Sequence, residues 1–78
     1  MARNPQYDIL QKALVDARKK TGLTQQEVAD RLGRPQSFVS KYECGERGLD
    51  IIELLAVCRT LGIKPLSILK KLEATGGQ

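Results

Sequence analysis

Apolar residues recur at the three- and four-residue spacing of an α-helix in five short segments of the chain. The first segment follows Asn4-Pro5, where Asn can cap a helix and Pro can occupy its first position. Gly22 stops it after a run of Arg and Lys that suits the end of a helix. This pattern predicts a first helix whose inward stripe is formed by Ile9, Leu10, Ala13, Leu14 and Ala17.

Two capping boxes predict the starts of two further helices. In a capping box, a Ser, Thr or Asp side chain accepts from the backbone three residues ahead, and a Glu at that position reaches back. Thr24 and Glu27 form such a pair ahead of a helix that ends at Gly33. Asp50 and Glu53 form the second pair, ahead of a helix that ends in an apolar run before the next glycine.

The remaining two helices begin at prolines, which preset the backbone of a first helical turn. Pro35 begins a short third helix, and Pro65 begins the last one. The sequence therefore predicts an all-α fold, a compact bundle of five short helices in a single domain over 1–78. Its core is expected to span about 7–73, and 74–78 is expected to form a flexible tail.

The second and third helices are joined by a tight turn that contains glycine, which is the geometry of a helix-turn-helix. Ala29 is small where the two helices should approach each other, and Gly33 provides the left-handed backbone of the turn. Val39 and Tyr42 face back and hold the third helix against the second. Together with Gln25, these residues form a spacing pattern that is far more specific than a lone glycine.

This set lies within TQQEVADRLGRPQSFVSKYECGER, which resembles the helix-turn-helix of phage repressors and Cro, the xenobiotic-response-element (XRE) family. The resemblance covers about residues 10–72. It implies a lambda-repressor-like domain that binds double-stranded DNA through its third helix. It also implies a two-fold dimer that binds a palindromic operator.

The third helix has a polar face opposite its inward stripe, and this face carries the candidate base contacts. Gln can pair bidentately with adenine, Lys can donate to guanine, and Ser can bond either base. An isolated polar face is more often simply solvated, but the helix-turn-helix setting favours recognition of DNA. The face comprises Gln36, Ser37, Ser40 and Lys41, and the resemblance places Gln36, Ser37 and Lys41 at base-contacting positions.

Three residues are candidate contacts to DNA phosphates. The resemblance assigns Gln25 to a phosphate and to bracing the third helix, and exposed amides at a helix start suit phosphate independently. Arg34 in the turn and Arg47 in the later loop are either phosphate contacts or ordinary surface charges. The resemblance also pairs Arg18 with Glu43 in a salt bridge between the first and third helices, with a free surface Arg18 as the alternative.

Two positions depart from the family pattern. Pro35 stands where Thr or Ser commonly caps the third helix, which leaves the start of that helix open. Cys44 stands where the family often has a polar residue. It is either a redox-sensitive thiol near DNA or an inert cysteine at a helix end.

The last two helices carry more apolar residues than a small domain easily buries. On the fourth helix one stripe is formed by Ile51, Leu54, Leu55, Cys58 and Leu61, with Ile52, Ala56 and Val57 beyond it. The excess is either a generous core or a subunit interface, and we favour a homodimer. The candidate dimer surface is formed by Leu66, Leu69 and Leu72.

Net charge and composition are weaker evidence for the function than the residue spacing. The net charge of +4, from 13 Lys and Arg against 9 Asp and Glu, permits a nucleic-acid partner without requiring one. The chain has no His, and Cys44 and Cys58 match no zinc spacing, so we expect no metal, no cofactor and no enzyme active site. No apolar run approaches a membrane span and the polar N-terminus does not resemble a signal peptide, so we expect a cytoplasmic protein with reduced thiols.

The sequence therefore predicts a sequence-specific, double-stranded-DNA-binding transcriptional regulator, a repressor or controller protein, that acts as a homodimer. It would block or contact RNA polymerase at its operator. One alternative is an antitoxin-type autoregulator bound to a partner toxin. Another is a protein-interaction module that has lost DNA binding, and the presence of Gln36 and Lys41 argues against it.

Overall fold

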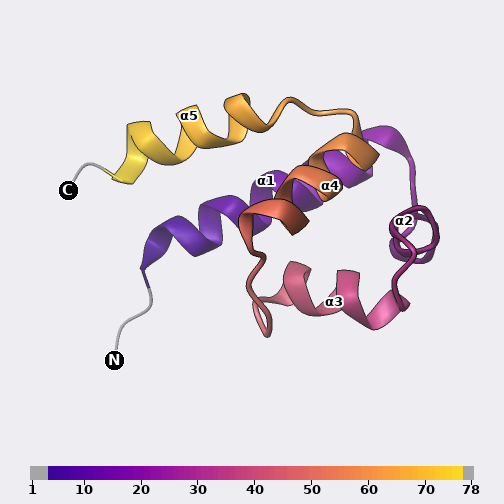
Figure 1. Ribbon diagram of the computed structural model, residues 1–78. Coiled ribbons are helices and arrows are strands. Elements are labelled where there is room, and N and C mark those ends of the chain that lie inside the picture. The colour runs from indigo at the N-terminus through magenta and orange to yellow at the C-terminus, as the bar shows by residue number, and fades with distance from the viewer. Residues whose placement is uncertain (1–3, 77–78) are drawn as a thin grey trace.

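Five α-helices make up the part of the chain, residues 4–76, that the computed structural model describes (Figure 1). No strand occurs within these residues, so the predicted all-α fold is confirmed. None of the described helices is long and apolar enough to span a bilayer. The helices are α1 (Pro5–Thr21), α2 (Gln25–Leu32), α3 (Gln36–Cys44), α4 (Ile51–Leu61) and α5 (Pro65–Gly76).

Side-chain caps define the starts of α2 and α4, and both predicted capping boxes form. Thr24 Oγ1 accepts from the Glu27 amide at 3.1 Å, and Glu27 Oε1 accepts from the Thr24 amide at 2.9 Å. The Asp50 and Glu53 pair repeats this exchange at 2.7 and 3.1 Å. Pro35 supplies no such bond. It is the N-cap residue of α3 with an extended backbone (φ −64°, ψ 152°), and the helix begins at Gln36.

The turn between α2 and α3 depends on Gly33, whose φ is +69°. An L-residue with a side chain would be strained in this left-handed conformation. The turn also satisfies a backbone carbonyl near the end of α2, because the Arg34 amide donates to the Ala29 carbonyl at 3.0 Å. The turn therefore ends α2 and directs the chain into α3 within a few residues.

The helices pack so that α3 lies on one side of the bundle and α5 on the other (Figure 1). α1 runs between them and contacts α3, α4 and α5, whereas α2 contacts α3 and α4. The start of α1 and the end of α5 meet, since Gln6 Nε2 donates to the Leu72 carbonyl at 2.7 Å. This arrangement leaves the outer face of α3 uncovered by the other helices.

The core lies between α1, α2, α3 and α4 and is closed by one residue of α5. Val57 is fully buried although the sequence places it beyond the main stripe of α4. Ile51, which the sequence places in that stripe, is 56% exposed in the first turn of the helix, next to Ile52 at 70%. The buried core residues are Leu14, Val28, Ala29, Phe38, Val39, Tyr42, Leu54, Val57, Cys58, Leu61 and Ile68.

The predicted dimer surface on α5 divides into two parts. Leu66 is 66% exposed and Leu69 is 42% exposed, whereas Leu72 packs against the core. α5 continues to Gly76, so residues 74–76 of the predicted tail are helical. Thr75 Oγ1 donates to the Lys71 carbonyl at 3.0 Å in this last turn. Residues 77–78 of the predicted tail lie outside the described residues.

The polar group of Tyr42 is poorly accommodated in the core. Its ring packs edge-on against Phe38, with the ring centroids 5.5 Å apart. Its hydroxyl is buried and has no hydrogen-bond partner among the described residues, and burial raises the pKa of this phenol. A buried hydroxyl without a partner loses its hydration without compensation.

We therefore expect Tyr42→Phe to stabilise the protein. The substitution keeps the ring contact with Phe38 and removes the unpaired hydroxyl, so the free energy of unfolding should rise by about 1 kcal/mol. Urea denaturation followed by circular dichroism measures this change. A clear loss of stability would show that the hydroxyl makes a favourable interaction in solution.

Candidate nucleic-acid interface

The polar face predicted on α3 is exposed in the structure. Gln36, Ser37 and Lys41 are exposed, and Ser40 is half-buried beside them. The Ser40 hydroxyl donates to the Ser37 carbonyl at 3.2 Å, within its own helix. Three of the four predicted base contacts are therefore exposed, and the hydroxyl of the fourth already has a backbone partner.

A partly buried ion pair joins α1 to the last turn of α3. Arg18 Nε donates to Glu43 Oε2 at 2.7 Å, and Arg18 Nη2 donates to Glu43 Oε1 at 3.0 Å. The two side chains are only 14% and 7% exposed, and Arg18 Nη1 also donates to the Leu23 carbonyl at 3.0 Å. The hydrogen bond to Glu43 raises the pKa of Arg18. A bidentate pair of this kind fixes orientation as well as distance.

The ion pair continues as a chain of side-chain hydrogen bonds to the polar face. Gln25 Nε2 donates to Glu43 Oε1 at 2.8 Å. Gln25 Oε1 in turn accepts from Gln36 Nε2 at 2.6 Å. The amide of Gln25 therefore connects the buried carboxylate to the first residue of α3. The resemblance implies that Gln25 braces this helix, and the structure shows the partners on both sides of its amide.

A second carboxylate, Glu53, binds both of the candidate phosphate-contacting arginines. Arg47 donates to it through Nη1 and Nη2 at 3.0 and 2.7 Å, and Arg34 donates through Nη2 at 3.1 Å. The hydrogen bonds from Arg47 and from the Asp50 amide lower the pKa of Glu53 to about 2. The sequence does not predict this cluster, because the capping box already explains Glu53 and no short-range spacing relates it to Arg34.

Both arginines also lie against one aromatic ring. The guanidinium carbons of Arg34 and Arg47 are 4.5 and 4.6 Å from the centre of the Phe38 ring. Cations at this distance are attracted to the face of an aromatic ring. Phe38, a buried residue of α3, therefore contacts both arginines.

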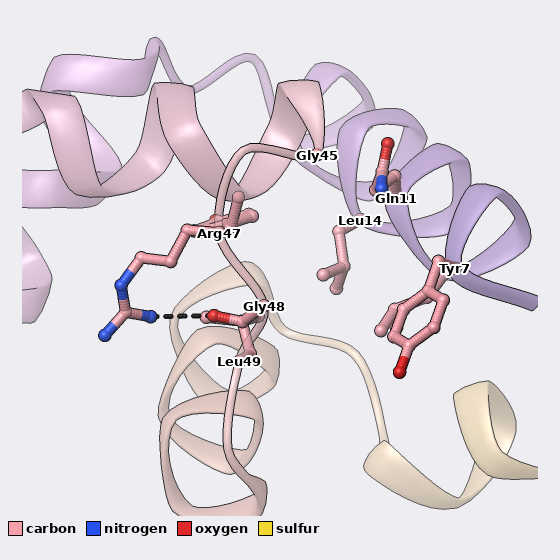
Figure 2. Close-up of a pocket in the computed structure, with 9 residues that line it drawn as sticks. Tyr7, Gln11, Leu14, Gly45, Arg47, Gly48 and Leu49 are labelled. Carbon is pink, nitrogen blue, oxygen red and sulfur yellow. Dashed lines mark hydrogen bonds between the residues drawn. The ribbon is translucent and has the colours of Figure 1, made fainter. Parts of the chain in front are cut away.

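A cavity of about 490 Å³ lies between α1 and the loop that follows α3, away from the polar face. Tyr7, Leu14 and Leu49 are among its lining residues (Figure 2). Figure 2 shows the Arg47 side chain extending away from Tyr7 and Leu14, with Nη1 donating to the Gly48 carbonyl at 2.8 Å. The guanidinium of Arg47 therefore belongs to the cluster around Glu53 and not to the cavity.

The two cysteines are free thiols in different surroundings. Cys44 is exposed at the end of α3, whereas Cys58 is buried in the core, where burial raises its pKa. The Cys44 thiol donates to the Lys41 carbonyl at 3.6 Å, a bond within its own helix. Neither cysteine takes part in the hydrogen-bond chain that orders the polar face.

These features define a class of protein. Two short helices joined by a glycine turn, with an exposed polar face on the second, form a helix-turn-helix of the DNA-binding kind. Comparison with known proteins agrees with this class. A helix-turn-helix family model matches residues 14–73 of the chain.

Individual proteins give the same result. The uncharacterized HTH-type transcriptional regulator y4dJ of Sinorhizobium fredii is 33% identical over 58 residues, which cover 74% of this chain and 75% of that protein. The solved structure of an XRE-family like protein from Pseudomonas syringae pv. tomato is 54% identical. The TM-score is 0.86, and the match covers 91% of this chain and 87% of the Pseudomonas chain.

A more distant solved structure, the clp gene regulator ClgR from C. glutamicum, is 25% identical with a TM-score of 0.80. The match covers 96% of this chain and 97% of that one. The protein therefore belongs to the XRE-type helix-turn-helix family of DNA-binding transcriptional regulators, as the resemblance in its sequence indicates.

The partly buried ion pair should matter far more for stability than an exposed one. We expect Glu43→Gln to lower the free energy of unfolding by about 2 kcal/mol, because Arg18 would keep its charge in a poorly solvated position. Asp16→Asn is the matched control. It breaks the Lys12–Asp16 pair, whose side chains are 77% and 60% exposed, and should change stability by less than about 0.5 kcal/mol.

Urea denaturation of both variants at neutral pH measures the difference between them. Equal effects of Glu43→Gln and Asp16→Asn would contradict a structural role for the Arg18–Glu43 pair.

Proposed function

We propose that the protein is a homodimeric regulator that binds a palindromic DNA operator and reads its sequence with the polar face of α3 in the major groove. Gln36, Ser37, Ser40 and Lys41 contact bases in this proposal. The observation that carries it is the exposure of this face together with the hydrogen-bond chain that fixes its first residue.

The bonding of Gln36 leaves the groups that a contact with adenine needs. Its Nε2 uses one hydrogen to donate to Gln25, so the second hydrogen and the Oε1 acceptor remain for a base. A glutamine amide pairs bidentately with adenine by accepting from N6 and donating to N7. The bond to Gln25 therefore orients the amide without using up its capacity to read a base.

The start of α2 and the residues that flank α3 supply the proposed phosphate contacts. Gln25 is the first residue of α2, and the first amides of any helix have no partner within the helix, so they suit an anion. Arg34 precedes α3 and Arg47 follows it. Contacts of this kind set the position of a protein on DNA and leave sequence discrimination to the base contacts.

Exposed apolar residues on α4 and α5 support the homodimer. Ile51, Ile52, Leu66 and Leu69 are all more than two-fifths exposed, and we infer that a second subunit covers them. Leu72 contributes less than the sequence predicts because it packs on the core of its own subunit. A two-fold dimer would present two α3 helices to successive turns of the major groove.

Selection of bound sites from random double-stranded DNA tests this function. Wild-type protein should enrich a two-fold symmetric consensus. Gln36→Ala and Lys41→Ala should each relax the preference at particular positions, with roughly tenfold or greater loss of discrimination there. Lys71→Ala is the matched control for Lys41→Ala, because it removes the same charge from α5 on the opposite side of the bundle (Figure 1).

The control should recover the wild-type consensus. Failure of the wild-type protein to enrich any consensus would contradict the proposal, and an asymmetric consensus would contradict the dimer. Identical behaviour of Lys41→Ala and Lys71→Ala would remove Lys41 from the base-reading face.

A further inference from the structure

Arg34 precedes α3 in the sequence and Arg47 follows it, yet their side chains meet at one carboxylate oxygen. Arg34 Nη2 and Arg47 Nη2 donate to the same atom, Glu53 Oε2, at 3.1 and 2.7 Å. Both guanidinium groups also lie on the Phe38 ring. Two cations this close would repel each other in the absence of an anion between them. Their meeting point is therefore set by Glu53.

The capping box with Asp50 holds the Glu53 side chain in place. Its carboxylate accepts from the Asp50 amide at 3.1 Å, and its own amide donates to Asp50 Oδ1 at 2.7 Å. The Glu53 side chain is 13% exposed, whereas those of Arg34 and Arg47 are 44% and 36% exposed. The carboxylate thus lies beneath the two guanidinium groups, which are the part of the cluster that solvent or a ligand can reach.

The guanidinium groups also retain donors. A guanidinium has five N–H donors. Among the described residues, the Arg34 guanidinium donates one hydrogen bond and the Arg47 guanidinium donates three, two to Glu53 and one to Gly48. The remaining donors of these two neighbouring guanidiniums are available to a second anion. The tetrahedral oxygens of a phosphodiester suit such donors.

We propose that Glu53 and Phe38 are positioning residues that hold Arg34 and Arg47 together as one preassembled site for a single phosphodiester group of the DNA backbone. This inference rests on the proposed DNA binding, and it assigns to Glu53 a role opposite to the one its charge suggests. A carboxylate near DNA normally weakens binding by repulsion. Here its removal should weaken binding, because the two arginines lose their common anchor.

The test compares two glutamates that occupy the same position in a capping box. Glu53→Gln and Glu27→Gln each remove one negative charge, and glutamine keeps an oxygen that can accept from the capping residue. Only Glu53 binds the two arginines. Any general effect of charge on DNA affinity is therefore shared by both variants, and a difference between them reports the positioning of the arginines.

The Kd for the selected operator would be measured over a range of KCl concentrations. At about 0.15 M salt we expect Glu53→Gln to weaken binding roughly tenfold, and the slope of log Kd against log salt to become shallower by about 1 to 2 per subunit. Glu27→Gln should bind at least as tightly as wild type with an undiminished slope. Phe38→Leu, which keeps an apolar side chain in the core, should share the shallower slope.

An Arg34→Gln, Arg47→Gln double variant separates positioning from a general effect on folding. In this background Glu53→Gln should no longer weaken binding, since the residues through which it acts are absent. Thermal melts establish that every variant is folded at the temperature of the binding assay. A salt slope is not changed by a modest loss of stability as long as the protein remains folded.

Several results would overturn the inference. One is binding by Glu53→Gln that is as tight as, or tighter than, binding by Glu27→Gln. Another is a loss of affinity that persists in the background that lacks both arginines. These outcomes leave the proposed function intact as long as wild-type protein binds its selected operator. Failure of the wild-type protein to bind any DNA would overturn the proposed function and this inference together.

Discussion

The ion pair between Arg18 and Glu43 determines how α3 is held in this protein. Its two hydrogen bonds, at 2.7 and 3.0 Å, join the longest helix of the bundle to the last turn of α3. Because both side chains are mostly buried, the pair is protected from solvent and its geometry is fixed by the packing around it. The same carboxylate then orders Gln25 and, through it, Gln36. The direction of the polar face thus depends on a partly buried interaction.

Two carboxylates organise the proposed DNA-binding surface, and they do so in the same way. Glu43, in the last turn of α3, binds the Arg18 guanidinium and the Gln25 amide. Glu53 binds the guanidinium groups of Arg34 and Arg47. Each is less exposed than the arginine side chains that it binds. Polar side chains that would otherwise sample many rotamers are therefore held before any ligand arrives, which reduces the entropy that binding must overcome.

Local signals in the sequence are sufficient to predict the helices, because capping boxes, prolines and glycines act on neighbouring residues. The pairing of Arg18 with Glu43 was predictable only from the family resemblance. Periodicity could not place Ile51, since α4 is apolar on more than one side and only its neighbours decide which side is covered. Glu53 shows the clearest limit. Its capping role is visible in the sequence, but its bond to Arg34 joins residues 19 apart and depends on tertiary packing.

In the proposed mode of DNA binding, the hydrogen bond between Gln25 and Gln36 orients the first base-reading side chain of α3. A double-mutant cycle with Gln25→Ala and Gln36→Ala tests it most directly. The quantity measured is the ratio of the Kd for a site with one base changed to the Kd for the selected operator. We expect Gln25→Ala to lower this ratio at the base read by Gln36 and to lower it no further in the Gln36→Ala background. Independent, multiplicative losses in the two variants would contradict it.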